Sequence, residues 1–297
     1  MPQLVANGVS LEYLSQGNPA DPTILLVMGL GTQLTGWPEA FCDNLVDLGY
    51  HVLRFDNRDI GLSQRMDHLP APNVPVVAGL RALGLPVRAG YTLDDMARDS
   101  IALLDALDVT KAHIVGASMG GMIAPLIAAQ FPARTLSLTS IMSTTGHRSL
   151  PGAERSATRA LMLQPEDPTD EESIIERNVR VRKALQSRTY PKPDEEIRET
   201  AAAAVKRGGY YPNGVARQLG AILAARHRRK LLRDVMAPAL VLHGDEDPLV
   251  KVECGVDTAN HLPNAELHIM KGMAHDFPTL LLPEMAERIH RTAQRTG

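Results

Sequence analysis

Short apolar runs bounded by turn residues recur along the 297-residue chain and predict buried β-strands. Between these runs, apolar positions three and four residues apart predict amphipathic helices at 38–48, 93–107, 119–130 and 283–292. Because strands that alternate with helices are typical of α/β proteins, we expect a mainly parallel central sheet with helices on both faces. The predicted strands are residues 9–14, 23–28, 51–55, 112–115, 136–142, 239–243 and 266–270.

The strand pattern is interrupted between residues 143 and 235, where charged helical segments follow one another. We therefore predict an α/β core made of residues 1–142 and 236–297, with a helical cap inserted at 143–235. The helical segments of this predicted cap span 171–188, 194–206 and 215–230.

A second irregular stretch, at 66–90, is rich in Pro, Val, Leu and Gly. It is too long for a plain connection between a strand and its helix. Ligands of open parallel sheets bind at the carboxyl ends of the strands. We therefore expect this stretch to fold over a site at that edge or against the cap.

A serine flanked by glycines follows one of the predicted strands. The segment Gly116-Ala117-Ser118-Met119-Gly120 lies between the strand at 112–115 and the helix at 119–130. A strand-to-helix turn of this kind is a nucleophile elbow, which holds the serine in a strained conformation and needs small residues two positions to either side. A serine that precedes a helix is also a common N-cap, so this motif alone does not settle its role.

Asp247 and His275 complete a catalytic triad with Ser118 in the chain order serine, acid, histidine. Asp247 lies in a turn directly after the strand at 239–243, and His275 lies in a glycine-containing loop after the last strand. We predict that Ser118 is the nucleophile, that His275 is its base, and that Asp247 orients His275. The neighbouring Asp245 and Glu246 are expected to form a solvated acidic turn.

An oxyanion intermediate needs two backbone donors. The residue after the nucleophile, Met119, supplies one N–H at a helix N-terminus, and Leu30, in the loop after the strand at 23–28, is expected to supply the other. Gly29, Trp37 and Tyr210 are the predicted substrate contacts. Because only 4% of the residues are aromatic, we expect an aliphatic pocket for esters with short to medium acyl chains.

The same loop allows a rival interpretation as a dinucleotide site. Gly29-Leu30-Gly31 follows a strand, and Asp56 ends the next predicted strand. Position 34 is leucine where the dinucleotide motif needs its third glycine, so this interpretation is disfavoured. Nor does any pair of histidines have ligand spacing. We expect no cofactor and no metal.

The net charge of −3 gives no general attraction to phosphate backbones or to anionic membranes, so neither nucleic acid nor membrane is an expected partner. The N-terminal residues lack a signal-peptide pattern, and a cytoplasmic location is expected. Cys42 and Cys254 are expected to be reduced thiols, with a disulfide between them as the alternative. The oligomeric state, monomer or homodimer, is left open.

Together these motifs resemble those of α/β-hydrolase-fold enzymes over essentially the whole chain. More narrowly, Val27-Met28-Gly29, the segment 55–63 (Phe-Asp-Asn-Arg-Asp-Ile-Gly-Leu-Ser) and the Ser118 elbow resemble bacterial serine esterases of the aclacinomycin methylesterase type. The resemblance implies hydrolysis of carboxylic esters through an acyl-enzyme, without a cofactor. It also implies structural roles for Asp56 and Arg58, which would pin the loop beneath the oxyanion strand.

Other activities share this set of residues. Carbon–carbon bond hydrolases of dione substrates, lactonases and perhydrolases use the same triad, and some proteins with this fold are slow ligand receptors. A serine nucleophile excludes the aspartyl-ester mechanism of haloalkane dehalogenases and epoxide hydrolases. Ester hydrolysis is the leading hypothesis.

Overall fold

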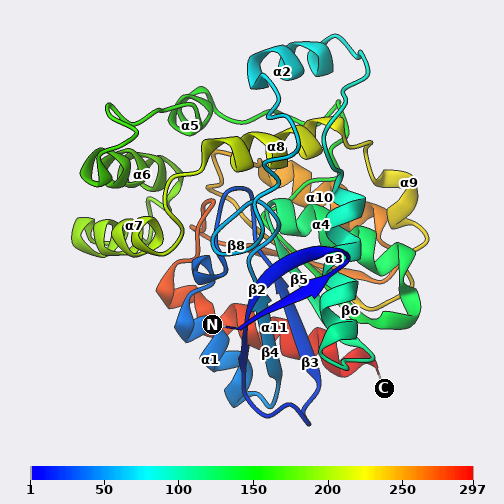
Figure 1. Ribbon diagram of the computed structural model, residues 1–297. Helices are drawn as coiled ribbons and strands as arrows, with labels where there is room; N and C mark the ends of the chain where they lie inside the picture. Colours follow the sequence, from blue (N-terminus) through cyan, green and yellow to red (C-terminus); the bar gives the residue numbers. More distant parts are fainter. Residues whose placement is uncertain (1, 297) are drawn as a thin grey trace.

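A computed structural model describes residues 2–296 and contains an eight-stranded sheet flanked by helices (Figure 1). The strand order is β1-β2-β4-β3-β5-β6-β7-β8. The β1/β2 and β2/β4 pairs are antiparallel, and every later pair in this order is parallel. The strands are β1 (Gln3–Ala6), β2 (Val9–Gln16), β3 (Thr23–Val27), β4 (His51–Phe55), β5 (Ala112–Ala117), β6 (Thr135–Ile141), β7 (Ala239–Gly244) and β8 (Ala265–Met270).

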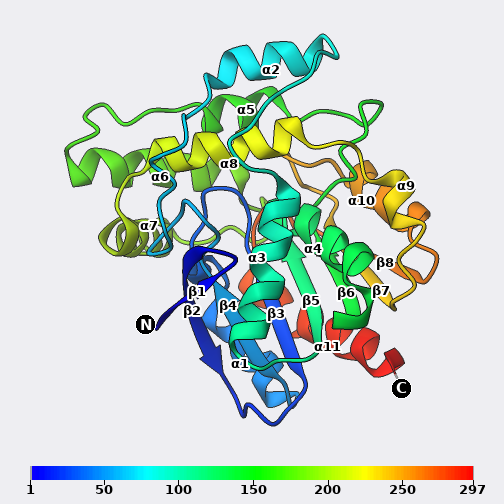
Figure 2. The same ribbon diagram turned by 45° about the vertical axis from the view of Figure 1, so that its right-hand side comes forward.

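The helices fall into two groups, those that cover the two faces of the sheet and those that lie beyond its carboxyl edge (Figures 1 and 2). Helices of the first group are α1 (Glu39–Asp47), α3 (Leu93–Ala106), α4 (Met119–Gln130), α9 (Arg229–Leu232), α10 (Val252–His261) and α11 (Leu282–Ala293). Those of the second are α2 (Val74–Ala82), α5 (Arg155–Leu161), α6 (Glu171–Leu185), α7 (Asp194–Gly208) and α8 (Pro212–Ala224).

Successive residues of β3 point into two different hydrophobic cores, one on each face of the sheet. Leu25 and Val27 lie in the core that includes α3 and α4, whereas Ile24 and Leu26 lie in the core that includes α1 and α11. All four side chains are fully buried. Because helices cover both faces, residues 24–27 of β3 are apolar at consecutive positions instead of at alternate ones. The mainly parallel α/β architecture predicted from the sequence is confirmed.

The sequence analysis did not predict β1, α2, α5 and α10 as elements, and β1 and α10 carry little local signal. β1 is a four-residue strand at the edge of the sheet, and the side chain of its Val5 is 72% exposed. α10 contains Gly255 and the β-branched Val256 and Thr258, which are weak helix formers. Its packing against β7 and β8 supplies the stabilisation that its local sequence lacks.

The prediction of one helix at 215–230 is wrong in its extent, because this stretch contains the end of α8 and the start of α9. The chain leaves the helical conformation at Ala225, where ψ is 140°, and becomes helical again in α9. Between the two helices, the backbone N–H of Arg228 donates to the carbonyl of Thr145 at 2.8 Å, and the Arg228 guanidinium donates to the carbonyl of Thr144. Contact with the chain segment after β6 therefore ends the helix.

Helices α5 to α8 connect β6 to β7 and lie beyond the carboxyl ends of the strands, with α2 packed on α8 (Figure 2). The 66–90 stretch thus packs against these helices, as expected. α9 instead packs on α4 and α10, and its Leu232 joins a core of the sheet. The division into a core and a cap at 143–235 stays a prediction of domain organisation. Within residues 2–296, no helix has the length and apolar character needed to cross a bilayer.

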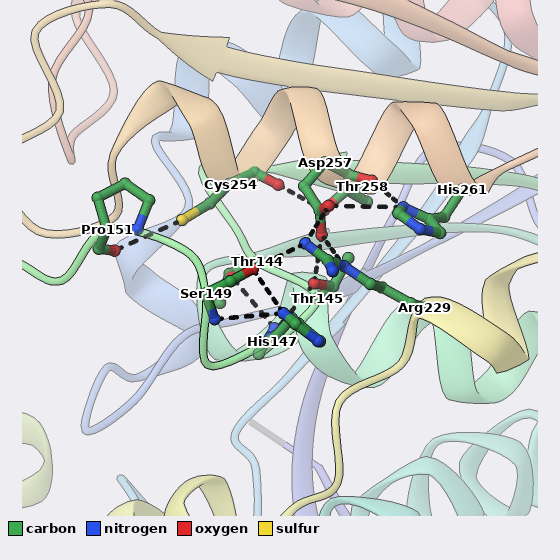
Figure 3. Close-up of polar contacts among 11 residues, drawn as sticks. Thr144, Thr145, His147, Ser149, Pro151, Arg229, Cys254, Asp257, Thr258 and His261 are labelled. Atoms are coloured by element: carbon green, nitrogen blue, oxygen red, sulfur yellow. Dashed lines mark hydrogen bonds and ion pairs between the residues drawn. The ribbon is translucent and has the colours of Figure 1, made fainter. Parts of the chain in front are cut away.

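One carboxylate on α10 ties together the two ends of the segment between β6 and β7 (Figure 3). Asp257 accepts a hydrogen bond from the Thr145 hydroxyl at 2.6 Å and forms an ion pair with Arg229 at 2.7 Å. Although burial opposes ionisation, Arg229 and Thr145 hold the pKa of Asp257 below its usual value. The helices over the sheet are therefore anchored where the segment begins and where it ends.

Cys42 and Cys254 are both free thiols, and both are buried. Burial raises the pKa of the Cys42 thiol to about 12. The disulfide that the sequence left as an alternative is not formed.

A buried ion pair links the loop after β4 to α3. Arg58 donates to both carboxylate oxygens of Asp99 at 2.6 Å, and both side chains are almost fully buried. We expect Asp99→Asn to lower the free energy of unfolding by about 3 kcal/mol, because it leaves the buried guanidinium without its counter-charge. Chemical denaturation measures this loss.

Asp105→Asn is the matched control on the same helix. Asp105 pairs with Arg134 at 2.5 Å, but its side chain is 58% exposed. Its loss should cost less than about 1 kcal/mol. Equal losses for the two variants would contradict the structural role of the Arg58–Asp99 pair.

Candidate active site

Ser118 lies at a strained turn between β5 and α4. Its φ of 54° and ψ of −115° lie in a region that non-glycine residues rarely adopt. The turn is held by the Ser118 N–H, which donates to the carbonyl of Ile141 on β6, and by the Ser143 hydroxyl, which donates to the carbonyl of Ser118. This role of Ser143 has no local sequence signal, because only the parallel β5/β6 pairing brings the residue to the turn.

The glycines at 116 and 120 are required by close backbone contacts. A Cβ at Gly116 would lie 2.1 Å from the carbonyl oxygen of Gly120, and a Cβ at Gly120 would lie 1.9 Å from the carbonyl oxygen of Val27. Any larger residue would push α4 away from the sheet. The predicted steric reason for the Gly-x-Ser-x-Gly pattern is therefore visible in these contacts.

The structure brings Ser118, His275 and Asp247 together from three loops that follow β5, β8 and β7. His275 Nε2 lies 3.0 Å from Ser118 Oγ, and His275 Nδ1 lies 2.8 Å from Asp247 Oδ2. With Nδ1–H donating to the carboxylate, Nε2 is free to accept the serine proton. This geometry can convert a hydroxyl into a nucleophile.

Asp247 is buried and its carboxylate is saturated with donors. Its Oδ1 accepts the backbone N–H groups of Leu249 and Val250, each at 2.8 Å, while Oδ2 accepts from His275. Burial alone would raise the pKa of Asp247, but His275 and these donors lower it below its usual value. The residue is therefore ionised at neutral pH.

The two acidic residues before Asp247 are exposed or partly exposed, in agreement with the expected solvated turn, and both also have hydrogen-bond partners. Asp245 accepts the backbone N–H of Gly272 at 2.7 Å, which ties the loops after β7 and β8 together. Glu246 accepts from the Thr189 hydroxyl at 2.6 Å and from the backbone of Arg188. Asp245 thus joins the loops that carry Asp247 and His275, and Glu246 joins the first of these loops to the segment after α6, through contacts distant in sequence.

Leu30 and Met119 are placed to act as the paired oxyanion donors. A Cβ at Gly29 would lie only 3.1 Å from the Cβ of Ser118, so the loop after β3 runs directly beside the serine. Met119 is the first residue of α4. Neither the Leu30 N–H nor the Met119 N–H has a hydrogen-bond partner among residues 2–296. Two unused donors beside a nucleophile can bind a developing negative charge.

Residues at the end of β4 support this loop from the core side. Asp56 accepts the backbone N–H of Leu34 at 2.6 Å, and the Asn57 side chain donates to the carbonyl of Met28 at 3.0 Å. Asp56 thus pins the loop as the resemblance implied. Arg58 is also structural, but it binds Asp99 on α3 and not the loop.

The three predicted substrate contacts occupy different environments. Gly29 lies against Ser118, whereas Trp37 is 1% exposed and stacks on Phe41 with ring centroids 5.6 Å apart. The Tyr210 hydroxyl donates to Gln164, and its ring packs beside the buried cluster between α6 and α7. The substrate contacts expected for Trp37 and Tyr210 are therefore not favoured, because the first is closed off by aromatic neighbours and the second is already paired.

Comparison with known proteins adds independent evidence. A family model described as alpha/beta hydrolase fold matches residues 22–278. The chain is 28% identical to the rhodomycin D methylesterase DnrP of Streptomyces peucetius, over 95% of this chain and 94% of that protein. It is 26% identical to 3-oxoadipate enol-lactonase 2 of Acinetobacter baylyi, over 90% of this chain and 87% of the relative.

Solved structures agree with this fold. A meta-cleavage product hydrolase from Pseudomonas fluorescens superposes with a TM-score of 0.76 at 18% identity, covering 100% of this chain and 98% of that one. The strand order and the strained turn at Ser118 are typical of α/β hydrolases. The chain belongs to the α/β hydrolase fold family. The methylesterase relatives confirm the resemblance to the aclacinomycin methylesterase type.

A second buried carboxyl, Asp276, lies next to His275. Burial raises the pKa of Asp276 to about 6, and the backbone groups of Ser187 and Ala274 offset part of this effect. The folded protein therefore keeps this proton up to about pH 6, whereas the unfolded chain releases it near the ordinary pKa of 3.8. Between these values the free energy of unfolding falls as pH rises.

Asp276→Asn removes this titration. As the pH rises from about 4 to about 7, the difference in free energy of unfolding, variant minus wild type, should increase by about 2 kcal/mol. Denaturation curves at the two pH values measure the change. A difference between variant and wild type that is the same at both pH values would contradict the shifted titration.

Proposed function

We propose that this protein is a carboxylic ester hydrolase that uses Ser118 as its nucleophile, His275 as general base and acid, and Asp247 to orient His275. The observation that carries the proposal is the continuous hydrogen-bonded relay, 3.0 Å from Ser118 to His275 and 2.8 Å from His275 to Asp247. The strained turn at Ser118 supports it, since the same conformation exposes the hydroxyl above the sheet.

In the acylation half, Ser118 Oγ attacks the ester carbonyl carbon while its proton moves to His275 Nε2. The imidazolium formed is stabilised by the ionised Asp247 at Nδ1. The negative oxygen of the tetrahedral intermediate accepts from the Leu30 and Met119 N–H groups. The intermediate then collapses, and His275 gives the proton to the departing alcohol.

In the deacylation half, water replaces the alcohol. His275 Nε2 takes a proton from the water as its oxygen attacks the acyl carbon, and the same two N–H groups hold the second oxyanion. Collapse of this intermediate breaks the bond to Ser118 Oγ, which regains a proton from His275. The carboxylic acid leaves and the enzyme is restored.

For the substrate, we favour small-molecule esters with short to medium acyl chains or small alcohol groups. The relatives named rhodomycin D methylesterases support the loss of an alcohol as small as methanol. Helices α5 to α8 lie over the carboxyl edge of the sheet, which supports a cap at 143–235 that limits access to Ser118. Two free cysteines suit a reducing compartment and support a cytoplasmic location.

Lactone and carbon–carbon bond hydrolysis are the alternatives within the same family. Relatives of this chain include an enol-lactonase and 2-hydroxy-6-oxononadienedioate hydrolases, at 26% identity each. The triad does not separate these reactions, because each needs an activated serine or water beside an oxyanion site. Turnover of an aryl ester series beside an enol-lactone and a dienedioate separates them.

We expect Ser118→Ala to lower kcat on simple aryl esters by roughly 10⁶-fold, because the hydroxyl is the group that forms the acyl bond. A fluorophosphonate should label the wild type at Ser118 alone, as judged by peptide mapping. Ser156→Ala, which removes an exposed serine on α5, is the control and should retain labelling and turnover. An adduct at another residue, or full activity in Ser118→Ala, would overturn the proposed mechanism.

A further inference from the structure

A buried glutamine on α8 contacts the loop that carries the proposed oxyanion donor. The Gln218 side chain is 0% exposed although it belongs to a helix beyond the edge of the sheet. One turn earlier on the same face, a methyl group of Val215 would lie 3.1 Å from a Cβ at Gly31. α8 therefore packs directly on the segment that contains Leu30.

The amide of Gln218 bridges two loops of the core. Its Oε1 accepts the backbone N–H of Gly31 at 2.9 Å, and its Nε2 donates to the backbone carbonyl of Arg58 at 2.8 Å. The Arg58 side chain is itself fixed by its buried pair with Asp99. Gln218 thus connects the loop after β3 to the backbone of the loop after β4, which the Arg58–Asp99 pair holds in place.

Gly31 is the point at which the loop has least support from the core. Asn57 holds the carbonyl of Met28 at the start of the loop, and Asp56 holds the N–H of Leu34 at its end. Between these two anchors, Gly31 adopts a φ of +62° and its N–H is bound by Gln218. The peptide after Leu30 is therefore oriented from α8.

The orientation of this peptide sets the direction of the Leu30 N–H. A peptide unit is planar, so rotation at Gly31 is passed to the backbone dihedrals of Leu30. Oxyanion stabilisation depends on donors that are already aimed at the transition-state oxygen, and small displacements are costly. Without Gln218, the partly buried Gly31 N–H would also lose its acceptor, which favours rotation of this peptide away from its present orientation.

Anchoring of α8 itself is achieved by a different residue. Arg217 donates to both carboxylate oxygens of Asp59 at 2.8 Å, and both side chains are buried. This pair holds the helix against the core without touching residues 28–34. The hydrogen bonds of Gln218 are therefore not needed to attach the helix, and they act on the loop.

We infer that Gln218 is a positioning residue that holds the Leu30 N–H in the geometry of the oxyanion hole. The inference rests on the proposed function, since it assumes that Leu30 stabilises an oxyanion during ester hydrolysis. It further means that α8 is a fixed part of the catalytic structure. A cap movement that displaced α8 would release Gly31 and weaken catalysis.

Gln218→Leu tests the inference, because leucine fills a similar volume but forms no hydrogen bond. On an aryl ester, we expect kcat to fall about 10- to 100-fold while KM changes by less than about 3-fold. Affinity for a trifluoromethyl ketone should fall by the same factor as kcat/KM, because its adduct with serine places an oxyanion on the same donors. A role in folding alone would not lower kcat/KM and the affinity for the ketone by the same factor.

Thr145→Val is the matched control. Thr145 is also a buried polar residue that ties the segment between β6 and β7 to the core, since its hydroxyl donates to Asp257 on α10 at 2.6 Å. It bonds no group of residues 28–34. We expect reduced thermal stability for this variant with kcat within about 3-fold of the wild type.

Q218E provides a second readout that does not depend on a folding defect. A protonated carboxyl offers one acceptor and one donor, as the amide does, but an ionised carboxylate cannot donate to the carbonyl of Arg58. The ratio of wild-type to Q218E kcat/KM should therefore rise at least about tenfold between about pH 5.5 and about pH 8.5. If Gln218→Leu fails to fold, this pH dependence decides the question.

The outcomes separate this inference from the proposed function. If Ser118→Ala is inactive but Gln218→Leu keeps its kcat and its ketone affinity, or if the Q218E ratio is flat with pH, the inference is wrong and the function stands. If Gln218→Leu raises KM with kcat unchanged, Gln218 shapes substrate binding and the inference is also wrong. If Ser118→Ala remains active, the proposed function itself fails.

Discussion

The close approach of α4 to the end of β3 is the constraint on which the site depends. Only glycine at 120 allows the helix to come so near the carbonyl of Val27, and only this approach places the first N–H of α4 beside the loop after β3. The strained conformation of Ser118 is the cost of this geometry, and the parallel β3/β5/β6 pairing stabilises it. The positions of Ser118 and of the Met119 N–H beside the loop after β3 are thus consequences of one backbone contact.

Around this contact, the molecule uses buried polar bonds where a hydrophobic core cannot specify direction. Apolar packing places the sheet and its helices, but it does not fix the rotation of a peptide plane or an imidazole ring. Asp247 and Asp245 order the loops that carry His275, and Asp56 and Asn57 order the loop that carries Leu30. Asp247, Asp56 and Asn57 are buried and paired, as the high cost of an unsatisfied polar group requires, whereas Asp245 acts from the surface.

The helices beyond the carboxyl edge of the sheet also form buried polar bonds with the loops of the core. Gln218 and Arg217 on α8 bind the loops after β3 and β4, and Arg207 at the end of α7 binds Asp56. The two ends of the inserted segment are tied to α10 through Asp257. These contacts explain how a segment that differs from the sheet in composition can influence the chemistry at Ser118.

The sequence by itself determined the α/β architecture and predicted the turn at Ser118, because buried strands, helical spacing and the glycine pattern around Ser118 are local properties of the chain. Its prediction that Ser118, Asp247 and His275 are the catalytic residues rests on their order in the chain and their positions after strands. Only the tertiary structure decided that Trp37 is packed in a core, that Asp245 and Glu246 have partners, and that α8 ends at Ala224. It also decided the contact of Gln218 with Gly31, which are 187 positions apart. Such contacts depend on which surfaces meet after folding, and a single residue in a helix carries no local signal of its distant partner.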